Sequence, residues 1–172
     1  QSGDLTLDDV AVTTGANTAL VFMRSTTGTV TVGASNFGVT GANLAVIADA
    51  GNIVAGAGNL RANVLFLHAN GAGGGVGTSA SPVLVQANTL TGSAGAGGFH
   101  VSDQAAATVN DVTSAGNITL GTLGAGNDLT VAGDVRYTGA SAASASLRSL
   151  RNIIVNGGAN VRSTSGTLDI TL

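Results

Sequence analysis

Nine aspartates supply all the acidic side chains of this 172-residue chain, which contains no glutamate. Paired carboxylates could cleave a glycosidic bond, but this reaction requires a defined separation across the bond. Asp8 and Asp9 are neighbours, so in a strand their side chains point to opposite faces. No motif links Asp103 and Asp111, although folding could bring them together. We therefore interpret the aspartates as solvent-facing turn residues and assign no catalytic residue.

Two histidines and one glycine-rich segment are the features of the sequence that could bind a metal ion. His68 and His100 each stand at the end of an apolar run, with no cluster of further ligands nearby. The string Gly124–Asp128 resembles half of a calcium-binding nonapeptide repeat, whose ions are held by oxygens from adjacent turns. Only one copy is present, so the sequence favours a corner and leaves calcium binding open. We assign no metal and no cofactor.

Binding of anions is a further possibility. The segment 71–77 is rich in glycine but cannot complete a phosphate loop, because the chain has no lysine. Arg148 and Arg151 form a small basic spot that could bind sulfated glycans, but solvated surface charge is the favoured interpretation. Thr29-Val30-Thr31 is similar to the threonine ranks of ice-binding solenoids but does not recur at each turn. A net charge of -3 with scattered arginines argues against a nucleic-acid groove.

The composition restricts the fold that must position these residues. Glutamate and lysine normally fill exposed helix faces, so their absence nearly excludes a helical bundle. The chain has no cysteine, which excludes disulfides and cysteine-based metal or redox sites. The mean hydropathy is +0.39. Even so, the longest strongly apolar run, residues 19–23, is far shorter than the roughly 18 residues of a membrane-spanning helix, so we expect no transmembrane segment.

Short apolar or alternating runs recur along the whole chain, about one per 12 residues, separated by Gly, Asn, Ser or Asp. They cover residues 5–12, 19–23, 29–32, 44–48, 52–55, 64–68, 83–86, 99–102, 108–112, 118–123, 129–131, 134–137, 153–155 and 167–172. This spacing indicates an all-β sandwich, barrel or solenoid. Recurring Gly-Asn-apolar strings, small side chains and only 3% aromatic residues favour the solenoid. Three strands and roughly 20 to 25 residues per turn predict about eight turns.

The region from Gly75 to Val135 carries a family resemblance. A Gly-x-Gly-Thr turn precedes Pro82 and a strand, followed by Gly97–Asp103 and then by the doublet 116–123 and 124–131. This pattern resembles filamentous-haemagglutinin-like adhesins, although Ser81 stands where that family usually has Asn. The resemblance implies a right-handed parallel β-helix from the shaft of a secreted or surface-exposed bacterial fibre. The Asn-Pro-Asn-Gly motif of the family's export domain is absent.

We therefore expect one β-solenoid segment over residues 1–172, an excerpt or processed part of a longer fibre, because the sequence begins without Met. A Gly-rich loop is expected at 71–77 and an irregular Ala/Ser-rich stretch at 139–150. The expected function is that of a stiff rod without catalytic activity, extracellular or on the bacterial cell surface. Its partners would be further coils of the same chain or identical copies end to end, with a host or cell-surface glycan also possible. The alternative is a β-helix carbohydrate-active enzyme or carbohydrate-binding module.

Overall fold

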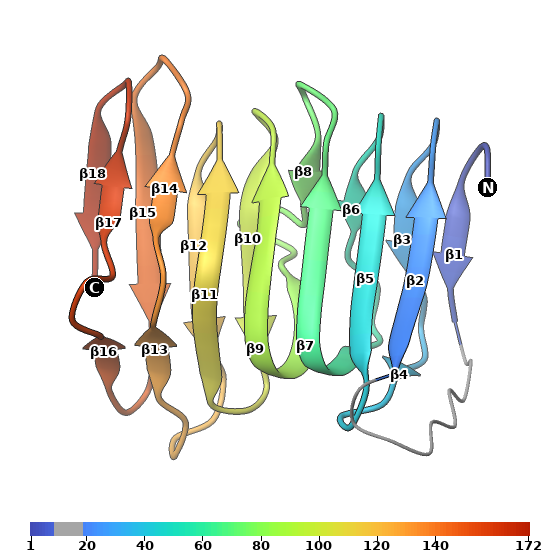
Figure 1. The fold of residues 1–172 in the computed structure, drawn as a ribbon, viewed down its shortest axis with the longest axis horizontal. Coiled ribbons are helices and arrows are strands. Elements are labelled where there is room, and N and C mark those ends of the chain that lie inside the picture. Colours follow the sequence, from blue (N-terminus) through green and yellow to red (C-terminus); the bar gives the residue numbers. More distant parts are fainter. Residues whose placement is uncertain (9–18) are drawn as a thin grey trace.

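The computed structural model describes residues 1–8 and 19–172, which form an all-β parallel solenoid of about seven turns. The strands lie side by side along one axis, with the N-terminus at one end and the last coils at the other (Figure 1). The described residues contain no helix, so none of them forms a helix that could cross a membrane. The strands are β1 (Leu5–Leu7), β2 (Leu20–Ser25), β3 (Val30–Val32), β4 (Phe37–Gly38), β5 (Asn43–Ala48), β6 (Ile53–Val54), β7 (Leu60–Ala69), β8 (Gly75–Val76), β9 (Val83–Ala94), β10 (Gly98–Asp103), β11 (Ala107–Ser114), β12 (Ile118–Thr122), β13 (Leu129–Val131), β14 (Val135–Tyr137), β15 (Ala143–Arg148), β16 (Ile153–Val155), β17 (Val161–Ser163) and β18 (Leu168–Thr171).

Two long parallel ladders make up most of the rod. Face A is the ladder β1–β3–β6–β8–β10–β12–β15–β18, and face B is the ladder β2–β5–β7–β9–β11–β14–β17. Shorter pairings close a third side, through β4, β7 and β9 in the first half and through β11, β13 and β16 in the second. Three strand positions per turn are therefore confirmed.

The number of turns follows from the spacing of partners on face A. Successive partners stand 19 to 27 residues apart, and seven such steps lead from Leu5 to Ile170. The average of about 24 residues per turn lies within the expected range of 20 to 25 but near its upper end, so the chain forms about seven turns rather than about eight. At roughly 4.8 Å per step, seven steps span about 34 Å along the axis.

Small and aliphatic side chains fill the interior in ranks. On face A the inward rank contains Ile53, Val76, Phe99 and Ile118, each 0% exposed. Each member lies directly over its partner in the next coil, so every added coil buries apolar surface on both sides, worth about 25 cal/mol per Å². The ring of Phe99 also fills the space beside Gly92, where an added Cβ would lie 2.7 Å from it.

Two segments are more regular than the sequence predicts. The expected loop 71–77 is a turn only as far as Gly74, because Gly75 and Val76 form the buried strand β8. The Ala/Ser-rich stretch 139–150 contains β15, which pairs in register with β12 and β18. Its alternate residues Ala145 and Leu147 are 0% exposed, so a low-hydropathy strand is stabilised here by the coils on either side. Pro82 stands immediately before β9, at a strand entrance as predicted.

Candidate functional site

Most described aspartates bond one coil to the next at the corners. Asp4 Oδ1 accepts a hydrogen bond from the Thr29 backbone N–H at 2.8 Å, and Asp8 Oδ1 accepts one from Ser35 at 2.8 Å. Asp111 Oδ1 accepts one from the Asp134 N–H at 3.1 Å. Each of these bonds joins residues 23 to 27 positions apart, which is one coil. Asp9 lies outside the described residues.

Asp134 is the most heavily bonded of these carboxylates. Its Oδ2 lies 2.7 Å from Arg162 Nη2 and 3.3 Å from Arg136 Nη2, and its Oδ1 accepts a bond from Asn160 Nδ2 at 3.2 Å. The hydrogen bond from Arg162, followed by that from Asn160, lowers the pKa of Asp134 to about 2. Two of its three partner residues, Arg162 of β17 and Asn160 just before it, belong to the next coil, so this carboxylate joins neighbouring coils.

Asp103 is the one deeply buried acid among the described residues, at 1% exposed. Its two oxygens accept hydrogen bonds from the backbone N–H groups of Ala105 at 2.8 Å and Ala87 at 3.1 Å. Burial raises the pKa of Asp103 to about 7, against the lowering effect of these two bonds. Asp111, by contrast, is exposed on β11. The structure therefore places these two acids in different surroundings, one capping buried backbone and one at an exposed corner.

The two histidines lie on different faces. His68 is in β7 on face B, where its Nδ1 lies 2.9 Å from Ser93 Oγ. His100 is in β10 on face A, where its Nδ1 lies 3.0 Å from Thr119 Oγ1. Burial lowers the pKa of both imidazoles. Within residues 1–8 and 19–172, no three His or Asp side chains gather in a group that could hold a metal ion.

The guanidinium of Arg151 contacts the corner at Gly124–Asp128. Asp128 Oδ1 accepts a hydrogen bond from Asn152 Nδ2 at 2.9 Å and lies 3.5 Å from Arg151 Nε. Arg151 Nη1 also donates to the Gly126 carbonyl oxygen at 3.3 Å. Arg151 therefore forms an ion pair with the acid of this corner.

One short hairpin interrupts the rod. Val76 of β8 pairs with Phe99, and Val83 of β9 pairs with Val101. The six residues 77–82 therefore lie opposite the single residue His100, and the five extra residues make this segment leave the coil. Thr78 and Ser81 exchange backbone hydrogen bonds at 3.0 and 3.2 Å, and Thr78 Oγ1 accepts a further bond from the Ser81 N–H. We call residues 77–82 the hairpin loop. It starts at Gly77, whose φ of +60° and closeness to the His100 carbonyl oxygen favour glycine.

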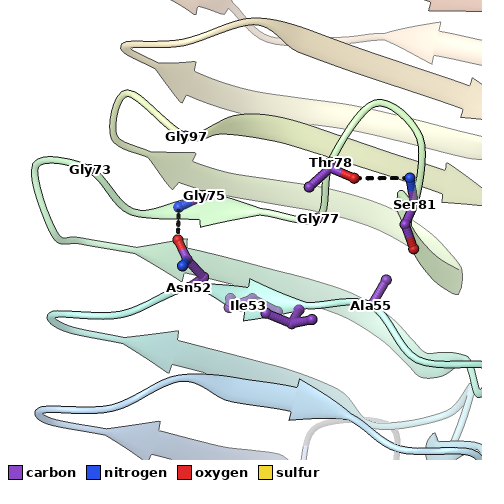
Figure 2. Close-up of a pocket in the computed structure, with 10 residues that line it drawn as sticks. Asn52, Ile53, Ala55, Gly73, Gly75, Gly77, Thr78, Ser81 and Gly97 are labelled. Carbon is purple, nitrogen blue, oxygen red and sulfur yellow. Dashed lines mark hydrogen bonds between the residues drawn. The ribbon is translucent and has the colours of Figure 1, made fainter.

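Two hollows flank the hairpin loop. The first hollow, about 340 Å³, lies toward the N-terminal coils and is drawn in Figure 2. Thr78 and Ser81 form its rim, and Asn52 lies at its edge with Oδ1 accepting a bond from the Gly75 N–H at 2.8 Å. Much of the remaining lining is backbone, because glycines recur there, so this hollow offers few side-chain groups to a ligand.

The second hollow, about 320 Å³, lies toward the C-terminal coils. It is lined by Ser102, Thr119, Gly121 and Arg148 of face A and by Pro82 of the hairpin loop. Of these residues, only Arg148 is a candidate from sequence alone. The others could not be recognised in the sequence, because the hollow exists only where the hairpin loop projects over strands that are distant in sequence.

These observations define the class of protein: a β-solenoid whose described corners are bonded by aspartates and from which the hairpin loop projects. Comparisons with protein-family models, curated proteins and solved structures found no match for this chain.

Proposed function

We propose that this chain is a structural segment of a secreted or surface-exposed bacterial fibre, built as a right-handed β-helix of the filamentous-haemagglutinin-like type. The observation that carries the proposal is the unbroken parallel ladder on faces A and B over about seven turns. The sequence resemblance between Gly75 and Val135 supports the family and the extracellular location.

The way coils are joined suits a mechanical role. Each coil is held to the next by backbone ladders, by the inward ranks and by corner side chains such as Asp4, Asp111 and Asp134. In a solenoid each coil contacts only its neighbouring coils, so the stiffness of the rod comes from these repeated contacts and needs none between distant coils. A rod built in this way can be lengthened by adding coils.

The last coil supports partners that continue the rod. Its residues Val155 and Ile170 are each 48% exposed, although the corresponding positions in earlier coils face the interior. An open strand edge readily pairs with another strand. We propose that either further coils of the same chain or a second copy covers this end.

The location can be tested with antibodies raised against the purified protein. Immunogold labelling of intact cells of the source organism should mark the cell surface or extended filaments. Labelling found only after permeabilisation would contradict the proposal. An antibody against a known cytoplasmic protein of the same cells is the control for cell integrity.

A carbohydrate-binding module is the second candidate function, and the second hollow is the observation in its favour. A carbohydrate-cleaving enzyme would need two carboxylates facing one groove. Asp4, Asp8 and Asp111 instead accept backbone hydrogen bonds across coils, and Asp103 is buried. For this second candidate, the geometry of the described aspartates therefore favours a carbohydrate-binding module over a carbohydrate-cleaving enzyme.

A further inference from the structure

Arg148 differs from the other exposed arginines of the rod. Four of the six arginines form ion pairs with aspartates: Arg24, Arg136, Arg151 and Arg162. No carboxylate among the described residues pairs with Arg148, whose only side-chain hydrogen bond there runs from Nε to Ser146 Oγ at 3.2 Å. Its two terminal nitrogens are therefore available to an anion beside the second hollow.

The register of face A places this guanidinium next to polar groups. Ser102, Gly121 and Arg148 occupy successive outward positions of β10, β12 and β15. Gly121 leaves the middle of this row empty, and an added Cβ there would meet nothing closer than 3.7 Å. The Ser102 hydroxyl makes no hydrogen bond to described residues, although the residue is only 9% exposed. A ligand hydroxyl can therefore satisfy it.

Apolar side chains complete the second hollow. Leu123 and Leu150 are 53% and 69% exposed, and Pro82 of the hairpin loop also lines the hollow. The volume of about 320 Å³ is at the lower end of the roughly 300–1,000 Å³ range of ligand pockets, as suits one small ligand. Aliphatic walls, hydroxyls and one guanidinium together match a ring with C–H faces, hydroxyl groups and a carboxylate.

We propose that the second hollow binds one acidic sugar residue, with its carboxylate against the terminal nitrogens of Arg148 and its ring over Gly121. Arginine binds carboxylates through two parallel N–H···O bonds, which gives this orientation specificity. Ser102 and Thr119 lie where they can bond ring hydroxyls, and Leu123 and Leu150 cover an apolar ring face. This site does not depend on the proposed role in a fibre, because all its residues belong to a single copy.

The test is a titration of the ¹⁵N-labelled full chain with glucuronate, glucose and acetate, followed by amide chemical shifts. We expect glucuronate to shift Gly121 and its neighbours and to bind at least about tenfold more tightly than glucose or acetate, because only glucuronate supplies both the ring and the carboxylate. Arg148→Gln should weaken glucuronate binding at least about tenfold. Gly121→Val should abolish binding, since it fills the hollow from an outward strand position that tolerates a β-branched residue.

Arg24→Gln is the matched control, because it removes an exposed arginine from face B. It should bind glucuronate like the unmodified chain. An unchanged amide spectrum in the absence of ligand shows that each variant is folded. The proposal is overturned if glucuronate causes no shifts at the second hollow, if acetate or glucose binds as tightly, or if folded Arg148→Gln retains full affinity.

Discussion

At the scale of single residues, the aspartates are structural corner groups. Asp4 and Asp8 satisfy backbone N–H groups of the following coil, and Asp134 gathers two guanidinium groups and an amide. Corners leave backbone donors unpaired, and a carboxylate is a strong acceptor for them. Side-chain bonds across coils therefore give most of the described aspartates a structural role.

Asp103→Asn should change how stability depends on pH. The pKa of Asp103 is about 7 when folded and near 4 when unfolded, so the folded state binds more protons between these values. Ionisation of Asp103 therefore lowers the free energy of unfolding as pH rises from 4 to 7, by roughly 2 to 4 kcal/mol in all. Urea unfolding of the Asn variant should show a correspondingly smaller loss of stability over this range.

The comparison must use the difference between variant and unmodified chain. His68 and His100 have lowered pKa values, so they act in the opposite direction, with stability falling as pH drops below their unfolded pKa near 6.5. Both chains share this histidine effect, which cancels in the difference. An identical pH slope in the two chains would show that Asp103 does not titrate in this range.

Asp134→Asn should destabilise the chain at neutral pH but not in acid. The folded pKa of about 2 lies below the unfolded value, so the stabilisation is present above pH 4 and disappears as pH falls toward 2. Urea midpoints should therefore be lower for the variant at pH 7 and should converge with the unmodified chain near pH 2. The control is Asp169→Asn in β18, since Asp169 forms no ion pair with described residues. Equal losses for both variants would contradict the role of Asp134.

At the scale of elements, the backbones of neighbouring coils approach closely at their corners. Gly133 follows β13 and lies against the Asn110 carbonyl oxygen of the preceding coil, in the space that a Cβ would need. Gly126 lies at another corner, where an added Cβ would meet nothing within 4 Å. Glycine is therefore required for steric reasons at position 133 but not at position 126.

Gly133→Ala should lower the free energy of unfolding by at least about 2 kcal/mol, because the carbonyl oxygen it meets belongs to the backbone and cannot move without disturbing the coil. Gly126→Ala should change stability by less than about 0.5 kcal/mol. Chemical denaturation of both variants measures this difference. Similar stabilities for the two would show that the corner at Gly133 relaxes easily.

At the scale of the whole molecule, the end-to-end association that we propose involves the last coil. Val155 and Ile170 expose apolar surface beside unpaired strand edges in the last coil. Both features are absent from the middle of the rod, where each strand has a partner on either side. Association is therefore expected along the axis rather than through the side faces.

Ile170→Lys should prevent end-to-end association, because a charge at this position opposes burial against another coil. Sedimentation velocity over a range of concentrations should show linear assemblies for the unmodified chain and monomers for the variant. Ala125→Lys, at an exposed corner away from the end, is the control and should associate normally. A monomeric unmodified chain at every concentration would exclude pairing between copies.

Much of the fold could be predicted because solenoid strands are short and locally encoded. The runs around Ile53, Val101 and Leu120 show alternating or apolar patterns that predict strands, and Asn or Gly marks the corners. The strand at 143–148 was predicted only as an irregular stretch. Its alanines and serines carry little hydropathy, and its burial is imposed by β12 and β18.

The sequence by itself indicated an all-β solenoid with three strands per turn, because strand patterns, turn residues and side-chain size are local properties of the sequence. Only the tertiary structure decided which residues meet across coils. Coil lengths vary from 19 to 27 residues, so no fixed spacing could show that Ser102, Gly121 and Arg148 share one row. The second hollow depends on that register and on five extra residues at the hairpin loop, and both are properties of the folded stack.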